Sequence, residues 1–266
     1  MWNFEHEPER SRLAVRYAIE PDTPAECAAK LASGRADIGL IPVAAYASPL
    51  AVIPGITIAS RDRVRSIILV VRSPDGIAGV RRVALDTASR TSATYTRILF
   101  SRFWKTQPEF LPHVPDLEAM LRVADAALLI GDPALLALED HKARERRTGE
   151  RLLYLDLAHE WHTFTGTVWV SAFWAVRLEA VSASSLTPAQ VTEDFQRSRD
   201  AGMAHVDDLA AEWAPQIAVP STTIRTYLSK NIWYILDDAC LAGLDLFYRY
   251  GVECGALRQA LSLRFL

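Results

Sequence analysis

Segments typical of β-strands alternate with segments typical of α-helices, and this alternation limits the folds open to the chain. Strands are expected at residues 13–19, 38–43, 66–71, 80–85, 126–130, 152–155 and 167–176, with helices at 90–104 and 116–123. Two capping boxes, Thr23-Pro-Ala-Glu26 and Thr187-Pro-Ala-Gln190, mark helix starts because their first and fourth residues satisfy each other's backbone N–H groups. Beyond residue 186 helices are expected at 188–201, 204–213, 221–231 and 237–250. We therefore predict an α/β protein with mainly parallel sheets.

Two long strands, at 66–71 and 167–176, bracket the middle third of the chain. The first is a continuous apolar run, as in strands that are buried on both faces. A chain that crosses to a second lobe and returns needs two such connections, and it leaves the first lobe discontinuous. We predict that lobe I consists of residues 1–70 and 172–266 and lobe II of residues 71–171. Because ligands of open α/β sheets bind beyond the carboxyl ends of the strands, we expect the site between the lobes.

The strand at 80–85 leads through a turn at residues 86–90 into a helix that begins with hydroxyl side chains. Ser89 is expected to be the helix N-cap. A helix start favours anions, because its backbone N–H groups are unpaired and the helix dipole is positive there. Arg90 adds a cation that can hold a carboxylate through two contacts. The alternative is a heavily capped helix on a polar loop. We expect an anion to be anchored by Ser89, Arg90, Thr91 and Ser92.

Four further segments are expected to reach the same cleft, namely Asp37–Tyr46, Val64–Ser66, Leu128–Leu135 and Thr165–Val170. Gly131 follows a strand and permits close approach of a ligand to the backbone. Asp132, followed by proline, has the pattern of a helix N-cap; alternatively it contacts a ligand or handles a proton. Trp169 is either a core residue or a platform for a ligand.

The charge balance and the histidine pattern argue against several classes of protein. The formal net charge of −3 disfavours a nucleic-acid-binding protein, which would usually carry a basic surplus. The mixed-sign run at 141–151 is interpreted as a solvated helix face, with binding of an acidic partner as the alternative. His159-Glu-Trp-His162 lacks the spacing of a zinc-binding H-E-x-x-H helix, and the histidines are scattered. Neither a metal site nor a Ser–His pair is therefore predicted.

The N-terminal residues lack the pattern of a secretion signal, because residues 1–12 are polar and carry three glutamates where an apolar segment would be needed. No apolar run is long enough to span a bilayer. The three cysteines are isolated and contain no C-x-x-C, so reduced thiols are expected. We predict a cytoplasmic protein that does not associate with a membrane; the oligomeric state is left open.

Five segments carry a resemblance to a known family, and they occur in this order: Asp37-Ile-Gly-Leu-Ile-Pro-Val43, Arg65-Ser66, Asp86-Thr-Ala-Ser-Arg-Thr-Ser92, Ile130-Gly-Asp-Pro-Ala-Leu135, and Asp156-Leu-Ala-His-Glu-Trp161 followed by Thr165-Gly166. The chain resembles chorismate dehydratase of the futalosine route to menaquinone, from about residue 2 to residue 257. The resemblance implies a two-lobed periplasmic-binding-protein-like fold of type II. It also implies removal of water from chorismate to give 3-[(1-carboxyvinyl)oxy]benzoate, without a metal or an organic cofactor.

The resemblance and the chemistry of chorismate together suggest residue roles. Chorismate carries two carboxylates, which suits an anion-binding helix start. Ser66 and Thr165 are expected to form hydrogen bonds with oxygens of the ring or the side chain. Asp132 is expected either to orient these groups or to move a proton. Further substrate contacts are expected from Gly131, Gly166 and Trp169.

In one respect the sequence departs from the family. Family members begin with a strand and a Leu-Asn loop that supplies an asparagine to the pocket, ahead of the segment corresponding to residues 1–4. We therefore expect lobe I to lack its first strand and the chain to be less stable and a poor dehydratase. Asn3 lies beyond the family's asparagine and is not assigned its role.

Two other functions remain open. One is the sister enzyme that cyclises dehypoxanthine futalosine, which shares the fold, although the Ser89–Ser92 run matches the dehydratase better. The other is a non-catalytic binding protein for a small carboxylate ligand.

Overall fold

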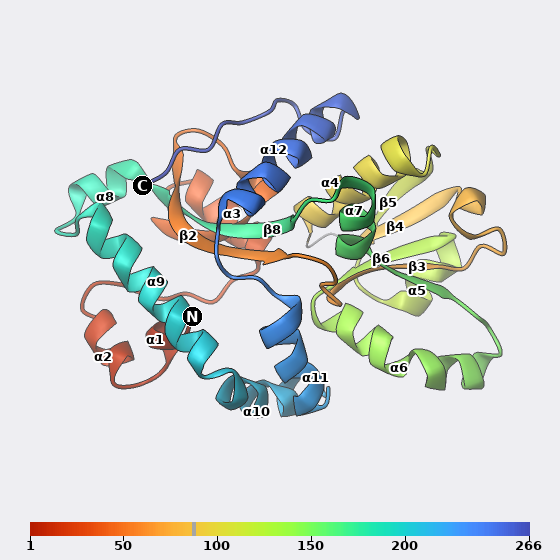
Figure 1. Ribbon diagram of the computed structural model, residues 1–266, viewed down its shortest axis with the longest axis horizontal. Coiled ribbons are helices and arrows are strands. Elements are labelled where there is room, and N and C mark those ends of the chain that lie inside the picture. Colours follow the sequence, from red (N-terminus) through yellow and green to blue (C-terminus); the bar gives the residue numbers. More distant parts are fainter. Residues whose placement is uncertain (87–88) are drawn as a thin grey trace.

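Two separate β-sheets organise the chain in the computed structural model, which describes residues 1–86 and 89–266 (Figure 1). The smaller one, sheet A, has the strand order β1-β8-β2, in which β1 is Ile38–Pro42, β8 is Trp169–Arg177 and β2 is Leu50–Ser60. The larger one, sheet B, has the order β5-β4-β6-β3-β7, formed by Glu109–His113, Arg82–Asp86, Ala126–Ile130, Ile67–Val71 and Leu153–Asp156. The predicted α/β class is confirmed.

The directions of the strands correct the expectation of mainly parallel sheets. β4 runs parallel to both β5 and β6. The other four pairings among the described residues are antiparallel, and each involves β3 or β8. β3 follows β2 of sheet A in the chain, and β8 follows β7 of sheet B, so each of the two strands enters its sheet directly from the other sheet. Each runs antiparallel to its neighbours in the sheet that it enters. The sheets are therefore mixed.

β3 and β8 also mark the two crossings of the chain. Residues 61–66 connect β2 to β3, and α7 (Leu157–Thr165) precedes β8. β3 is buried along its whole length, as expected for a strand covered on both faces. It pairs only within sheet B, and β8 only within sheet A, as far as the described residues go. The residue bounds of the two lobes stay a prediction.

Helices from both ends of the chain cover sheet A, in the left part of Figure 1. α3 (Pro24–Ala32) packs on β1, and α9 (Pro188–Ala204) packs on β2 and on α1 (Trp2–Glu5). Both predicted capping boxes are present at the starts of α3 and α9. The other elements of this part are α2 (Glu9–Leu13), the 3-10 turn η1 (Val43–Ala45), α8 (Leu178–Ala183) and α12 (Asp238–Glu253).

The strand expected at residues 13–19 is wrong. α2 ends at Leu13, and no strand covers residues 14–23. Leu13 is buried in the same apolar cluster as Phe4 of α1. A strand is stable only when neighbouring strands pair with it, and no described strand pairs with this segment. Burial of Leu13 on a short helix therefore prevails over the local strand pattern.

Sheet B is surrounded by helices that follow its strands. α4 (Arg90–Ile98) continues as a π-helical turn, η3 (Leu99–Phe103), and the later helices are α5 (Leu117–Val123), α6 (Asp132–Thr148) and α7. The 3-10 turn η2 (Gly76–Gly79) lies between β3 and β4. α10 (Val206–Ile217) and α11 (Ser221–Thr226) lie at the lower edge of Figure 1, near α6. The π-helical turn η4 (Tyr227–Asn231) follows α11 directly in the chain.

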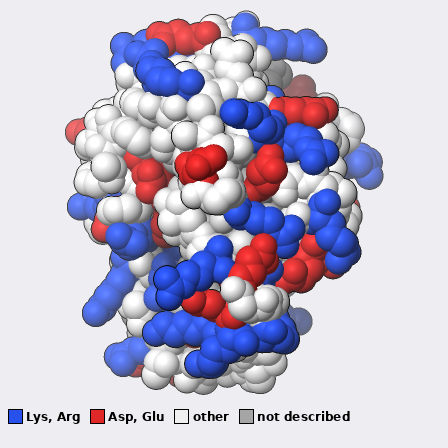
Figure 2. Space-filling view, turned by 90° about the vertical axis from the view of Figure 1, so that its right-hand side faces the viewer, with Lys and Arg blue, Asp and Glu red and all other residues white. Residues whose placement is uncertain are grey.

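Charged side chains of both signs are interspersed on the end of the molecule shown in Figure 2. The mixed-sign run at 141–151 lies at the end of α6, and much of it is paired. Arg144 is buried between Glu118 and Glu150, and Arg151 pairs with Glu145. None of the helices formed by the described residues combines the length and the apolar character that a bilayer crossing needs.

Candidate functional site

One edge of sheet B collects most of the predicted site residues. β4, β6 and β7 end there, and β3, which is antiparallel to β6 and β7, begins there. The register pairs Ile67 with Ile130 and Ile68 with Asp156, so Ser66 and Gly131 face each other just beyond the paired positions and Asp156 lies opposite Ile68. We call this the carboxyl edge of sheet B. Three helices, α4, α6 and α7, start at it, so their backbone N–H groups and positive dipole ends lie along one border.

The start of α4 has the predicted cap. Ser89 is the N-cap, and its hydroxyl accepts a hydrogen bond from the backbone N–H of Ser92 at 3.1 Å. Thr91 and Ser92 are buried, whereas Arg90 is exposed and forms no ion pair within the described residues. The hydrogen bond from Ser92 confirms the prediction that Ser89 is the N-cap. Residues 87–88 of the predicted turn lie outside the described residues.

Contacts on two sides fix the orientation of α4. The Thr91 hydroxyl accepts a hydrogen bond from the backbone N–H of Ala44, which brings the segment at 37–46 to the helix start, as the sequence predicted. One turn further on, the ring of Tyr95 stacks on Trp169 with 3.6 Å between centroids. The Tyr95 hydroxyl accepts a hydrogen bond from the backbone N–H of Val170 at 3.2 Å. The helix start is thereby anchored to both η1 and β8.

Ser66 is held at the beginning of β3 by its backbone. Its carbonyl oxygen accepts a hydrogen bond from the N–H of Gly131 at 2.8 Å, so these two predicted site residues are brought together. The preceding residue, Arg65, has a φ of 63°, in the left-handed region that residues other than glycine rarely adopt. Asp156 stabilises this turn, because its carboxylate accepts hydrogen bonds from the N–H groups of Val64 at 3.2 Å and Arg65 at 2.7 Å.

The Asp156 carboxylate has a second task at the start of α7. It is the N-cap of that helix and accepts from the N–H groups of Ala158 and His159. Burial raises the pKa of the Asp156 carboxyl, and the backbone hydrogen bonds oppose that shift. One buried side chain thus joins the helix start to the turn that carries Ser66.

The hydroxyl of Ser66 has a partner that the sequence did not reveal. Tyr227, the first residue of η4, donates its phenolic hydrogen to Ser66 Oγ at 3.1 Å. Four residues later, Asn231 donates from Nδ2 to the carbonyl oxygen of Arg63 at 3.0 Å. Two side chains of η4 therefore hold the crossing segment at 63–66.

Asp132 begins α6, but it is not the helix N-cap, so that interpretation is wrong. Gly131 occupies the cap position with φ 62° and ψ −140°, a conformation that only glycine adopts readily. Asp132 is the first helical residue, is exposed, and makes no capping hydrogen bond. Asp132 instead lines a cavity of about 340 Å³.

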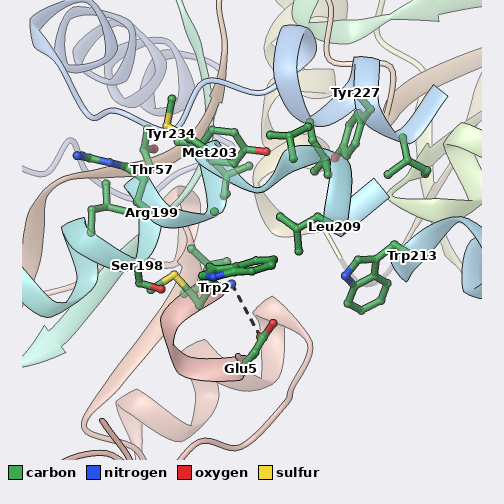
Figure 3. Close-up of a pocket in the computed structure, with 18 of the residues that line it drawn as sticks. Trp2, Glu5, Thr57, Ser198, Arg199, Met203, Leu209, Trp213, Tyr227 and Tyr234 are labelled. Carbon is green, nitrogen blue, oxygen red and sulfur yellow. Dashed lines mark ion pairs between the residues drawn. The ribbon is translucent and has the colours of Figure 1, made fainter. Parts of the chain in front are cut away.

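This cavity extends from Asp132 to residues of all three strands of sheet A. Side chains from α1, β2, α9, α10, α11 and η4 line it, and its aromatic members are Trp2, Trp174, Trp213, Tyr227 and Tyr234. Figure 3 shows Trp2, Leu209 and Trp213 along one side, with Tyr227 and Tyr234 on the opposite side. Burial raises the pKa of Tyr227, the hydrogen bond with Ser66 opposes that shift, and the charge of Asp132 adds to it, so the Tyr227 hydroxyl stays protonated at neutral pH.

The remaining three predicted residues lie elsewhere. The Thr165 hydroxyl donates to the carbonyl oxygen of Trp161 at 2.7 Å and contacts Thr167 Oγ1 at 2.9 Å. Gly166 ends α7 with a φ of 67° and is exposed. Trp169 has no exposed surface. None of the three lines the cavity at Asp132, and their contacts with a ligand stay a prediction.

Among the described residues, no group of three or more histidine, cysteine, aspartate or glutamate side chains is arranged to hold a metal ion. The polar groups described at the carboxyl edge of sheet B include hydroxyls, backbone N–H groups, the exposed Arg90 and the carboxylates of Asp132 and Asp156. They are suited to bind an oxygen-rich anion and to move a proton.

Solved structures with the same fold include proteins of different organisms. Protein AF1704 from Archaeoglobus fulgidus is similar with a TM-score of 0.66 and 18% sequence identity, over 90% of this chain and 86% of that one. The periplasmic aliphatic sulphonate binding protein SsuA from Escherichia coli is similar with a TM-score of 0.59 and 15% identity, over 97% and 87%. The Candida albicans CA3427 gene product, described as having the generic periplasmic binding protein fold, has a TM-score of 0.58 and 10% identity, over 94% and 87%. These likenesses confirm the predicted periplasmic-binding-protein-like fold.

A family comparison extends this result from the fold to the sequence. The family described as menaquinone biosynthesis matches residues 2–253, which is nearly the whole chain. The resemblance inferred from the five sequence segments is confirmed at this level. The chain belongs to the menaquinone biosynthesis family.

Proposed function

We propose that the protein is a chorismate dehydratase, a lyase that removes water from chorismate to give 3-[(1-carboxyvinyl)oxy]benzoate. The observation that carries the proposal is the meeting of two helix starts and the Ser66 hydroxyl at the carboxyl edge of sheet B. Membership of the menaquinone biosynthesis family supports a substrate from that pathway. Chorismate has the chemistry that this edge requires, since it is a small ring compound with two carboxylates and a hydroxyl.

The start of α4 is assigned to one substrate carboxylate. Ser89 already accepts a hydrogen bond from Ser92, so further backbone N–H groups of the first turn and the exposed Arg90 supply the contacts. A charge-assisted contact from a guanidinium is about twice as strong as a neutral hydrogen bond. Because Arg90 has no competing ion pair within the described residues, its charge is available to a ligand.

Ser66 and Asp132 are assigned to the elimination itself. Loss of the ring hydroxyl and of the proton on the neighbouring carbon makes the ring aromatic, so the reaction is strongly downhill. Asp132 takes the ring proton, the carbon–oxygen bond breaks, and the proton leaves with the hydroxyl as water. Ser66 donates a hydrogen bond to the departing oxygen, where negative charge develops. Positioning and exclusion of water contribute the rest of the acceleration.

The test is to incubate the purified protein with chorismate and to follow the aromatic product by absorbance and mass. Ser66→Ala is expected to lower kcat, while Ser182→Ala, at an exposed hydroxyl on α8, is the matched control. Conversion of dehypoxanthine futalosine instead of chorismate would assign the sister cyclase. Binding of chorismate without turnover would assign a non-catalytic binding protein, and either result overturns the proposal.

A further inference from the structure

We propose that Tyr227 is a positioning residue that fixes the hydroxyl of Ser66 as a hydrogen-bond donor to the ligand. The inference rests on the proposed function for the identity of the substrate. It assigns to the C-terminal π-helical turn η4 a role in the chemistry at the carboxyl edge of sheet B.

The direction of the hydrogen bond carries the first step. A serine hydroxyl has one hydrogen and two lone pairs. Tyr227 donates its hydrogen to Ser66 Oγ, so one lone pair is occupied and the hydrogen of Ser66 remains free for a third group. Without that bond the Ser66 hydroxyl could rotate and donate to a nearby carbonyl oxygen. Tyr227 therefore selects the rotamer in which the Ser66 hydroxyl donates its hydrogen to the ligand.

The geometry of η4 carries the second step. Tyr227 and Asn231 lie four residues apart on a π-helical turn, and both bond to the crossing segment at 63–66. Single π-helical turns are rare and are found frequently at functional sites. The backbone contact of Asn231 holds the segment, which leaves the Tyr227 hydroxyl for the side chain of Ser66. The tyrosine bond reaches across 161 positions of the sequence, so it exists only in the folded chain.

The surroundings of Tyr227 keep it in the donor state. Its titratable neighbours are Asp132 on α6 and Tyr234 beyond η4, and its hydrogen-bond partner is Ser66 on the crossing segment. Burial raises the pKa of Tyr227 and favours the neutral phenol; the hydrogen bond with Ser66 opposes that shift, and the negative charge of Asp132 adds to it. A neutral phenol donates its hydrogen, whereas a phenolate would accept one from Ser66 and reverse the arrangement. Because the pKa of Tyr227 is raised above its ordinary value, the neutral, donating phenol is the form present at neutral pH.

In the proposed elimination, the arrangement acts on the departing oxygen. The proton of the ring carbon passes through Asp132 to the leaving hydroxyl, which departs as water. Ser66 stabilises the charge on that oxygen by its hydrogen bond, and Tyr227 keeps the Ser66 hydroxyl oriented toward that oxygen. Ser66 and Tyr227 are chemically unchanged at the end of the cycle, so atoms and charge balance.

The experiment is a double-mutant cycle with Tyr227→Phe, Ser66→Ala and both changes together. Tyr227→Phe keeps the ring and removes the hydroxyl, so we expect kcat to fall about tenfold with little change in KM, because one hydrogen bond is worth roughly that factor. The double variant is expected to be no slower than Ser66→Ala alone. Tyr17→Phe is the matched control, since this half-buried tyrosine donates to Asp194 at the same distance, 3.1 Å, outside the site. Its kcat should equal that of the wild type.

A second readout separates this inference from the proposed function. Binding of isophthalate, a stable aromatic dicarboxylate, is measured by calorimetry for the wild type, Tyr227→Phe, Ser66→Ala and the double variant. Additive effects of the two substitutions on both kcat and isophthalate affinity would overturn the positioning role. Coupled effects on affinity without any turnover of chorismate would overturn the proposed function and retain the positioning role. Neither turnover nor binding by the wild type would overturn both.

Discussion

Replacing Asp156 with asparagine is expected to separate the two tasks of this carboxylate. Its Oδ2 accepts the N–H of Arg65 at 2.7 Å. Its Oδ1 accepts three further N–H groups, those of Val64 at 3.2 Å, Ala158 at 3.1 Å and His159 at 3.3 Å. An asparagine whose carbonyl oxygen replaces Oδ1 keeps these three bonds and turns an NH2 group toward Arg65. The cap of α7 survives, while the Arg65 N–H in the turn before Ser66 loses its acceptor.

The magnitudes follow from these contacts. A hydrogen bond to a charged acceptor contributes about 1.5–3 kcal/mol, and asparagine caps a helix about as well as aspartate, so Asp156→Asn should lower the free energy of unfolding by about 2 kcal/mol. Asp156→Ala removes every acceptor. Loss of the cap costs about 1 kcal/mol and each of the two unpaired N–H groups in the turn about 1–3 kcal/mol, for a total of about 3–7 kcal/mol.

Urea unfolding and chorismate turnover are the assays for these two variants. We expect Asp156→Asn to remain folded and to lose turnover, because Arg65 leaves its left-handed conformation and moves Ser66. The control is Asp116→Asn, which changes an exposed N-cap whose carboxylate accepts the N–H of Ala119 at 2.9 Å and should alter neither property. Equal losses of stability in Asp156→Asn and Asp156→Ala, or unchanged turnover in Asp156→Asn, would refute the reasoning.

Three further outcomes are expected. Arg90→Ala should weaken isophthalate binding about 30–150-fold, which corresponds to about 2–3 kcal/mol for a charge-assisted pair, and unchanged affinity in calorimetry would contradict the assigned anchor. Burial raises the pKa of Cys240 to about 12, so iodoacetamide at pH 8, where only about 10⁻⁴ of this thiol is ionised, should label Cys240 in urea but not in the native protein, as peptide mass mapping can check. Gly243→Ala would bring a Cβ to 2.3 Å from the carbonyl oxygen of Val168 and should lower the unfolding free energy by about 1–3 kcal/mol. Gly202→Ala, whose Cβ meets nothing closer than 3.6 Å, should instead raise it by up to about 1 kcal/mol in the same denaturation series.

Elements whose signals are local could be predicted from the sequence. β6 covers Ala126–Ile130 as expected, because an apolar run of that length between turn signals has few other solutions. The Ser89 cap and both capping boxes were predicted because each motif closes within four residues. β2 was not predicted, since Pro54 and Gly55 interrupt its pattern where the register shifts. β5 was missed because Pro112 makes it resemble a loop.

The candidate site likewise contains residues whose role could be predicted from the sequence and residues whose role could not. The hydroxyls of the α4 start are visible as a motif, whereas the roles of Asp156 and Tyr227 depend on partners 91 and 161 positions away. No periodicity or cap signal marks such a contact. In the sequence, Asp156 is visible only as part of a segment that carries the family resemblance. The fold reveals that its carboxylate caps α7 and also holds the turn before Ser66.

The continuity of sheet B along the chain has a consequence for the order of folding. All of its strands lie between residues 67 and 156, so it can form as soon as that stretch has been synthesised. Sheet A can form completely only after the C-terminal residues have been synthesised, because Ile38 pairs with Val176 and Val52 pairs with Phe265. In the interval, β1 and β2 have exposed hydrogen-bonding edges beside a sheet that is already folded. Aggregation and proteolysis of the nascent chain should therefore begin at residues 38–60.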